Sequence, residues 1–376
     1  MEEYRRHQII WRMLYAIANR WICRKFRLTH EDLHVEGPVL LIPNHVTSWD
    51  PLLVAMSLRD KQVYYVASEH IFRFGLVSKL INWLVAPIPR RKAASGADTV
   101  KACLRHLRAG HSVCLFAEGE QSWDGTNHPI FPATGKLAKS AGATLVTYRL
   151  EGGYLSLPRW GKGVRRGKMH GHPVGIYPPE QLKAMQPEEI NALIEQDIAE
   201  NAWDRQREDP VAYRGKNRAE GLETALYYCP ACRRIGTLHT RGDRIFCGCG
   251  LDLLYEETGF FAPDSPCATI HEWDLLQREA IKKLPVGTDK PIFSDGEMQL
   301  SRIDAGHRET VLGRGELQQF SDRLSCAGTD FPLSDIDSMA MVQANLLLLS
   351  TCGNYYQIRA TKPANLRKYL HYRKEN

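Results

Sequence analysis

The sequence predicts an α/β fold, with a mixed sheet and helical cover, followed by two smaller units. Short apolar runs alternate with helical stretches up to about residue 205, which is the pattern of a sheet covered by helices. Four of the ten cysteines then fall in two close pairs within 229–249. The remainder consists mainly of short strand-like runs and ends in one helical stretch. These three observations indicate several domains of different class.

The composition supports that division. A chain of 376 residues exceeds one typical core, and 43% hydrophobic against 24% charged residues is typical of folded domains. We therefore expect a first domain over 1–205, a polar linker over 206–222, a cysteine-containing unit over 223–258 and a β-rich domain over 268–376.

Membrane-spanning and exported classes are not indicated. No run of 18 apolar residues occurs, and the N-terminus lacks the apolar core and small-residue cleavage site of a signal peptide. Cysteines outside the cluster lie in mostly apolar contexts, and we expect reduced core residues of a cytoplasmic protein. They are Cys23, Cys103, Cys114, Cys267, Cys326 and Cys352.

The segment 4–26 is predicted to be an amphipathic helix, because apolar residues recur at helical spacing from Ile10 to Trp21. Basic residues outnumber acidic ones in 1–27, which suits an anionic membrane surface better than a nucleic-acid groove. We therefore expect a peripheral protein on the cytoplasmic face of the cell membrane, with no nucleic-acid partner. A helix packed on its own domain, with solvated arginines, explains the same pattern.

Apolar periodicity and the positions of Gly and Pro set the other elements of the first domain. A basic, aromatic segment over 154–172 is expected to be either a solvated loop or a contact surface for a membrane or an anionic substrate. Strands are expected at 39–42, 63–67, 113–116, 144–148 and 174–177, and helices at 51–59, 69–84, 98–109, 137–141 and 187–205.

A histidine and an aspartate follow the first buried strand, at His45 and Asp50. His45 lies just past the carboxyl end of strand 39–42, where open α/β sheets build their sites. On one helix, residues five positions apart point away from each other, so contact between His45 and Asp50 requires a turn in the backbone. Pro51 favours such a turn, because it suits the first position of a helix whose N-cap would be Asp50. The alternative is that Asp50 only caps the helix and His45 is an ordinary loop residue.

Two further blocks follow in order: Val85-Ala86-Pro87-Ile88-Pro89-Arg90 and Val113-Cys114-Leu115-Phe116-Ala117-Glu118-Gly119-Glu120-Gln121-Ser122. With the box from Pro43 to Pro51 they make residues 1–205 resemble the glycerolipid acyltransferase family, whose type member is 1-acylglycerol-3-phosphate O-acyltransferase. The resemblance implies transfer of a fatty acyl group from acyl-CoA or acyl carrier protein to the free hydroxyl of a lysophospholipid. The expected acceptor is 1-acylglycerol-3-phosphate, giving phosphatidate.

The resemblance also assigns roles to residues. His45 would act as general base on the acceptor hydroxyl, and Asp50 would orient the imidazole and stabilise the imidazolium. Arg90 would pair with the acceptor phosphate, and Glu118 and Gly119 would order the acceptor-binding loop. The alternatives are a surface role for Arg90 and a helix-capping role for Glu118.

One position departs from the family pattern. The third block often continues Glu-Gly-Thr-Arg-Ser, whereas this chain has Glu120 and an uncharged Gln121. Phosphate recognition by that block is therefore in question, and the substitute cations are Arg90 or Arg91 and Lys136 or Lys139. The alternatives are a different lysolipid acceptor, or a non-catalytic adaptor that binds membrane lipids.

The cysteine pairs predict a structural zinc site. Cys229 and Cys232, then Cys247 and Cys249, can place four thiolates around one Zn²⁺, as in a zinc ribbon. A hairpin turn is expected at 241–243 between the pairs. A redox dithiol or a disulfide is the rival interpretation.

The β-rich segment 268–376 looks like a pleckstrin-homology (PH) or GRAM-like domain by its pattern of strands and a closing helix. A lipid-binding module and a small packing domain both fit it. Helices are expected at 270–283 and 364–372, and strands at 298–303, 316–320, 340–342, 346–350 and 355–359.

Overall fold

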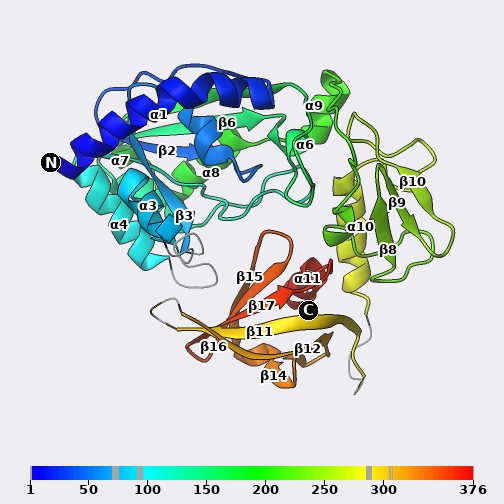
Figure 1. Ribbon diagram of the computed structural model, residues 1–376. Helices are drawn as coiled ribbons and strands as arrows, with labels where there is room; N and C mark the ends of the chain where they lie inside the picture. The colour runs from blue at the N-terminus through cyan, green and yellow to red at the C-terminus, as the bar shows by residue number, and fades with distance from the viewer. Residues whose placement is uncertain are drawn as a thin grey trace. The chain divides into compact units, whose positions relative to one another are not determined.

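The computed structural model describes residues 2–69, 76–90, 96–284, 290–304, 306 and 308–375. The chain divides into two compact units, each considered by itself (Figure 1). Unit 1 comprises 1–91, 95–159 and 163–215, and unit 2 comprises 92–94, 160–162 and 216–376. Within the described residues, no helix is both long and apolar enough to cross a bilayer.

Unit 1 is built on a seven-stranded sheet of order β1-β7-β6-β2-β5-β3-β4. The five strands from β6 to β4 run parallel, whereas β7 is antiparallel to β6 and parallel to β1. The predicted mixed α/β sheet is confirmed. The strands are β1 (Leu28–His30), β2 (Val39–Pro43), β3 (Val63–Ser68), β4 (Ile88–Arg90), β5 (Ser112–Cys114), β6 (Thr144–Glu151) and β7 (Met169–Tyr177).

Helices cover the sheet because alternate strand residues are apolar on each face. One continuous core joins Leu40, Val113 and Leu145 of the central strands to buried residues of α4, α5, α7 and α8. The alternate strand residues, such as Tyr148, point to the opposite face of the sheet, which α2 covers. There the hydroxyls of Tyr148 and of Ser57, just after α2, lie 2.6 Å apart. The helices are α1 (Glu2–Phe26), α2 (Asp50–Ala55), α3 (Leu76–Val85), α4 (Ala97–Arg108), α5 (Ala133–Ser140), α6 (Gly153–Ser156), α7 (Pro179–Ala184), α8 (Pro187–Ile198) and α9 (Ala202–Glu208).

Several predicted boundaries change. The single helix expected over 187–205 is wrong: it breaks after α8, and Asn201 caps α9 by accepting hydrogen bonds from the amides of Trp203 and Asp204. The helix expected at 137–141 begins at Ala133 instead. The helix expected over 69–84 lies partly outside the described residues, and α3 accounts for its second half.

Helix α1 confirms that the N-terminal segment packs on its own domain. Its inner face packs on unit 1, where Trp11 Nε1 donates to Leu58 O (2.8 Å) and Phe26 is buried. Its outer face leaves Met13 63% and Ile17 76% exposed. The helix therefore packs on its own domain and still presents an apolar stripe.

The basic segment 154–172 is neither a solvated loop nor a surface along its first part. Tyr154 is buried and donates its hydroxyl to Trp123 O (3.0 Å). The Arg159 side chain is 3% exposed. The expectation failed because the partners of these side chains are remote in sequence.

The expected linker 206–222 carries buried side chains. Tyr213 is buried in unit 1 and donates to Lys168 O (2.9 Å), whereas Ala219 and Leu222 are buried in unit 2. The boundary between the units falls inside this segment, after Gly215.

Unit 2 begins with a three-stranded antiparallel sheet of order β10-β9-β8. The hairpin expected at 241–243 is present: Arg241 pairs with Arg244, and Gly242 takes the positive φ of 62° that such a tight turn favours. The strands are β8 (Leu238–Arg241), β9 (Arg244–Cys247) and β10 (Asp252–Leu254), preceded by a 3₁₀ turn at Leu222–Thr224.

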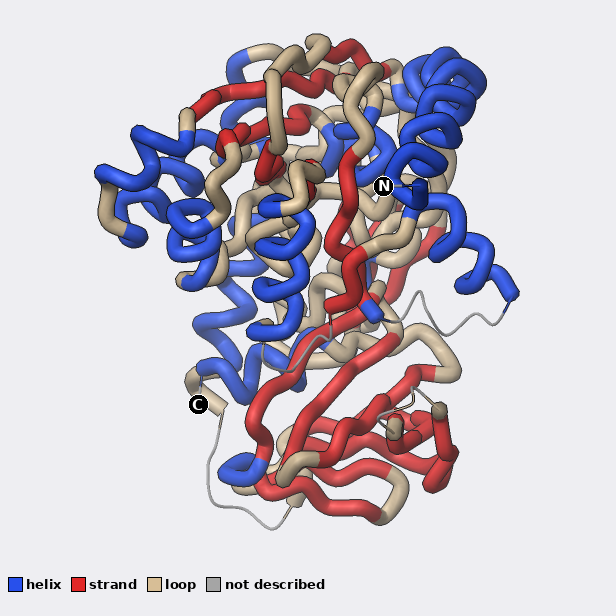
Figure 2. The backbone as a smooth tube through the Cα atoms, turned by 90° about the vertical axis from the view of Figure 1, so that its left-hand side faces the viewer, coloured by secondary structure: helices blue, strands red, loops and turns tan. Residues whose placement is uncertain are grey.

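A second, seven-stranded antiparallel sheet of order β14-β13-β12-β11-β17-β16-β15 forms the rest of unit 2 (Figure 2). The β-rich prediction is confirmed, although the short hairpin of β13 and β14 was not expected. The closing helix begins at Arg367, three residues later than predicted. The elements are β11 (Phe293–Ile303), β12 (Glu309–Gln319), β13 (Arg323–Cys326), β14 (Thr329–Pro332), β15 (Ile336–Val342), β16 (Leu346–Thr351), β17 (Asn354–Ala360) and α11 (Arg367–Glu375).

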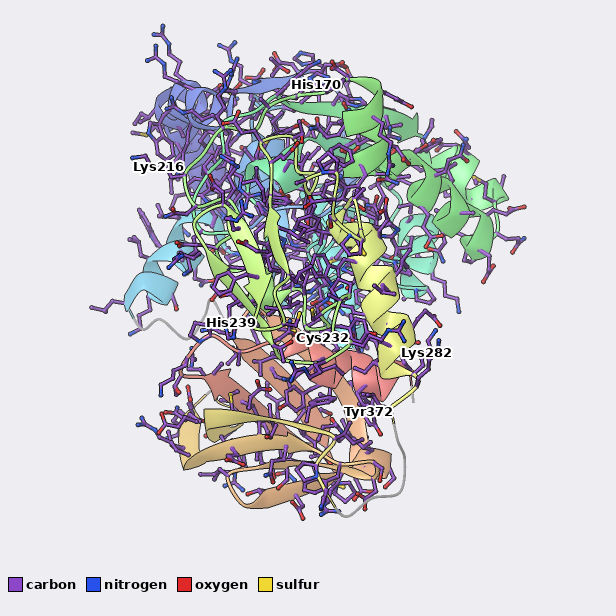
Figure 3. All side chains as sticks on the ribbon, turned by 90° about the vertical axis from the view of Figure 1, so that its right-hand side faces the viewer. His170, Lys216, Cys232, His239, Lys282 and Tyr372 are labelled. Carbon is purple, nitrogen blue, oxygen red and sulfur yellow. The ribbon has the colours of Figure 1, made fainter. Side chains whose placement is uncertain are left out.

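Helix α10 (Ile270–Ile281) joins the two parts of unit 2 by contacting α11. The Arg367 guanidinium makes two contacts with the Asp274 carboxylate, and both side chains are 1% exposed. Lys282 follows the end of α10 (Figure 3). Its Nζ lies 3.3 Å from Glu375 Oε2 at the end of α11. The two parts are therefore packed together rather than loosely tethered.

Candidate active site and metal site

The structure brings His45 and Asp50 into contact. His45 follows β2, a fully buried strand with parallel neighbours on both sides, so it emerges at the carboxyl edge of the sheet. His45 Nδ1 lies 2.7 Å from Asp50 Oδ2, and the imidazole stacks on Phe116 with ring centroids 4.4 Å apart. Because Nδ1 faces a carboxylate, it carries the ring proton, and Nε2 is left as the basic nitrogen.

Asp50 does more than contact the imidazole. Its buried carboxylate also accepts the amides of Val46 (2.6 Å) and Thr47 (3.0 Å) and the Thr47 hydroxyl (2.7 Å). The expected N-cap position is wrong by one residue, since α2 begins at Asp50 and Trp49 precedes it. The carboxylate instead closes the turn before the helix, which is what folds residue 50 back onto residue 45.

Glu118 holds the backbone of His45 from the neighbouring strand. It follows β5, and its Oε1 accepts the His45 amide (2.8 Å) and Asn127 Nδ2 (3.0 Å), while Oε2 accepts the His128 amide (2.7 Å). Burial raises the pKa of Glu118 to about 8, against the lowering effect of these donors. Glu118 is therefore neither a surface acid nor a helix cap.

Gly119 and Arg90 meet through Phe131. A Cβ on Gly119 would lie 2.2 Å from the Phe131 ring, and Gly119 has a φ of +68°, so glycine alone fits there. The Arg90 guanidinium carbon lies over the same ring, 4.1 Å from its centroid. Among the described residues, buried Arg90 Nε has no hydrogen-bond partner. Phe131 thus places Arg90 beside the loop that holds His45.

Arg159 compensates the negative charge of Glu120, a pairing that the sequence did not reveal. Arg159 Nη1 lies 2.6 Å from Glu120 Oε1 and 3.4 Å from Gln121 O, and its guanidinium stacks on Trp123 (4.2 Å). Of the substitute cations considered, Arg91 lies outside the described residues. Lys139 donates to Met185 O (2.7 Å) instead.

The sequence found the residues inside the motifs and missed those that support them. Thr47 lies within the box, so its hydroxyl could have been proposed as a turn-forming group. Asn127, His128 and Arg159 lie outside every block and reach the site only through tertiary packing. No local pattern distinguishes them.

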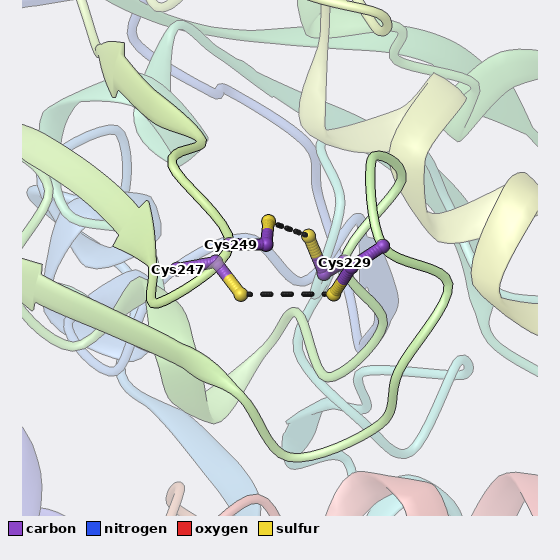
Figure 4. A group of neighbouring side chains, drawn as sticks. Cys229, Cys247 and Cys249 are labelled. Atoms are coloured by element: carbon purple, nitrogen blue, oxygen red, sulfur yellow. Dashed lines mark hydrogen bonds between the residues drawn. The ribbon is translucent and has the colours of Figure 1, made fainter.

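The four clustered cysteines converge as predicted (Figure 4). All four Sγ atoms lie within 4.8 Å of one another, and all four residues are free cysteines. Cys229 and Cys249 Sγ are 3.7 Å apart, and Cys232 and Cys247 Sγ are 3.8 Å apart.

These distances fit a tetrahedral metal ion. Zinc–thiolate bonds of about 2.3 Å in a tetrahedron place sulfur atoms about 3.8 Å apart. Arg234 hydrogen-bonds Cys232 and lowers the pKa of that thiol to about 6, which favours the thiolate that zinc binds. Four sulfur ligands leave no open position, so such a metal would be structural.

Comparison with known proteins bears on unit 1. The family model described as Acyltransferase matches residues 25–151. The chloroplastic 1-acyl-sn-glycerol-3-phosphate acyltransferases LPAT1 of Arabidopsis thaliana and BAT2 of Brassica napus are each 25% identical over 130 residues, 34% of this chain. The match spans only 36% and 37% of those relatives' own lengths.

Among solved structures, the 1-acyl-sn-glycerophosphate acyltransferase PlsC of Thermotoga maritima is similar, with a TM-score of 0.42 and 16% identity. The match covers 50% of this chain and 75% of the PlsC chain. The family-model match makes residues 25–151 of unit 1 an acyltransferase-type domain. Over residues 25–151 the chain is similar to acyltransferases.

Glu118 makes stability pH-dependent. Its pKa of about 8 in the folded protein exceeds the ordinary value of 4.5, so the folded state binds more protons than the unfolded state between these values. We expect the free energy of unfolding of unit 1 to fall, by on the order of a few kcal/mol, from pH 5 to pH 8. Urea denaturation at each pH measures it, and Glu118→Gln should reduce the slope. An equal slope in that variant would contradict the assignment.

The cysteine cluster predicts one zinc ion per full-length chain. Cys247→Ser removes one of four ligands, and we expect metal content, measured by mass spectrometry after dialysis, to fall at least about tenfold. Cys352→Ser, an exposed cysteine outside the cluster, is the matched control and should keep its zinc. Purified wild-type protein without bound metal would refute the site.

Proposed function

We propose that this protein is an O-acyltransferase that moves a fatty acyl group from acyl-CoA or acyl carrier protein to the free hydroxyl of a lysophospholipid. The observation that carries this proposal is the 2.7 Å contact between His45 Nδ1 and Asp50 Oδ2 at the carboxyl edge of the sheet. The contact leaves Nε2 as a base of fixed tautomer, as acyl transfer to an alcohol requires.

The chemical step uses the acceptor itself as nucleophile. His45 Nε2 takes the proton of the acceptor hydroxyl while the oxygen attacks the thioester carbonyl carbon. The tetrahedral intermediate then collapses, the carbon–sulfur bond breaks, and the imidazolium returns its proton to the leaving sulfur. Asp50 stabilises the imidazolium between these two transfers.

The acceptor phosphate is assigned to Arg90, whose guanidinium can pair with it in a forked geometry. Phe131 and Gly119 hold that side chain beside the loop of Glu118. Glu118 acts as a positioning residue through the His45 amide. The relatives' names make 1-acylglycerol-3-phosphate the first acceptor to assay, whereas uncharged Gln121 favours a different lysolipid as the alternative.

Membrane association rests on α1. The helix exposes Ile9, Met13, Ile17 and Trp21 at four-residue spacing and carries Arg24 and Lys25 in its last turn. Helix α3, which contacts α1, exposes further apolar side chains, including Leu76, Leu80 and Trp83. An apolar stripe with basic residues suits insertion into an anionic leaflet. We propose a peripheral protein on the cytoplasmic face of the cell membrane.

The activity is tested by acyl transfer from labelled donors to a panel of lysophospholipids. We expect His45→Ala to lower kcat by about 10²–10⁴-fold, because the general base is lost, without changing the thermal unfolding temperature by more than a few degrees. His34→Ala is the control for histidine removal outside the site. Wild-type rates in His45→Ala would remove that residue from the mechanism. Vesicle binding without any transfer by the wild-type protein would favour the adaptor instead.

Vesicle sedimentation tests the membrane surface. Ile17→Asp, on the exposed stripe of α1, should weaken binding to anionic vesicles about tenfold or more, because an inserted apolar side chain contributes about 1.5–3 kcal/mol. Ile176→Asp is the matched control, since Ile176 is 50% exposed on β7. Equal binding by the two variants would exclude α1 as the contact surface.

A further inference from the structure

Residues 118–122 wrap the backbone of His45. At one end the Glu118 carboxylate accepts the His45 amide (2.8 Å), and at the other the Ser122 amide donates to His45 O (2.9 Å). Glu120 and Gln121 lie between these two contacts. Any charge that they carry therefore lies close to the point where the acceptor hydroxyl must approach the imidazole.

Within the described part of the chain, the negative charge of Glu120 is paired with Arg159. Glu120 Oε1 lies 2.6 Å from Arg159 Nη1 and accepts Trp123 Nε1 (3.2 Å). The Arg159 side chain is 3% exposed and stacks on Trp123, and the Glu120 side chain is 19% exposed, so the pair is largely shielded from solvent. A shielded pair interacts strongly, and losing one partner leaves the other charge uncompensated.

Among the described residues near this loop, Arg90 is a cation that the Glu120–Arg159 pair does not engage. It stacks on Phe131 beside Gly119, and its Nε has no hydrogen-bond partner within the described part of the chain. One guanidinium matches one phosphate charge in a forked pair. A phosphomonoester carries nearly two charges above its second pKa of about 6, whereas a phosphodiester carries one.

We propose that the Glu120–Arg159 ion pair sets the headgroup preference of the acceptor subsite, making a lysophospholipid with a singly charged phosphodiester the favoured acceptor over a phosphomonoester. This inference rests on the proposed acyl transfer and specifies its substrate class. Glu120 holds the charge of Arg159 in balance, so that Arg159 positions residues 120–121 and does not bind the acceptor phosphate.

The experiment compares kcat/KM for two 1-acyl acceptors of identical chain length at pH 8, one a phosphomonoester and one a phosphodiester. Wild-type protein should favour the diester. Glu120→Gln uncovers the Arg159 charge and should shift the ratio toward the monoester about tenfold or more, through KM. The double variant Glu120→Gln/Arg159→Gln removes that charge again and should return the ratio to within about threefold of wild type.

The outcomes separate this inference from the function on which it rests. A wild-type preference for the monoester, or an unchanged ratio in an active Glu120→Gln variant, would overturn the headgroup assignment and leave acyl transfer standing. A purely structural pair would lower both rates alike. If Glu120→Gln does not fold, Gln121→Arg adds a cation at the adjacent position and must shift the ratio in the same direction. Transfer to neither acceptor by wild-type protein would refute the enzyme assignment itself.

Discussion

The hydrogen bonds accepted by Asp50 determine the rest of the site. One buried carboxylate gathers the His45 ring nitrogen, two backbone amides and the Thr47 hydroxyl. Residues five apart would face away from each other on one helix, so this turn is what brings the side chains of His45 and Asp50 together. The strand before it and the helix after it supply a rigid frame at both ends.

The neighbouring strand supports the same histidine from its backbone side. The Glu118 side chain accepts hydrogen bonds from the His45 amide and from Asn127 Nδ2. Asn127 Oδ1 in turn accepts the Glu200 amide (2.5 Å). Glu200 in turn pairs with Arg205 (2.5 Å). A continuous polar chain therefore runs from Arg205 in α9 to the backbone amide of His45. Such a chain restricts the position of His45, and the general base that we propose needs a fixed position.

The fold and the motifs were predictable where local pattern decides them. The buried strand before His45, the hairpin around Gly242 and the convergence of four cysteines follow from apolar runs, turn residues and ligand spacing. The break between α8 and α9 was missed because helical periodicity continues through it. Arg159 was misjudged as part of a basic loop because its partner, Glu120, lies 39 residues away in sequence. Contacts of that kind are set by packing and leave no local signal.

The most direct test of this account is the protonation of the His45 ring, measured by ¹⁵N NMR on the full-length protein at a pH where the ring is neutral. We expect a proton on Nδ1, hydrogen-bonded to Asp50, and an unprotonated Nε2. The Asp50→Asn variant should lose this preference. A neutral ring with its proton on Nε2 in the wild-type protein would contradict the claim that Asp50 prepares His45 as the base.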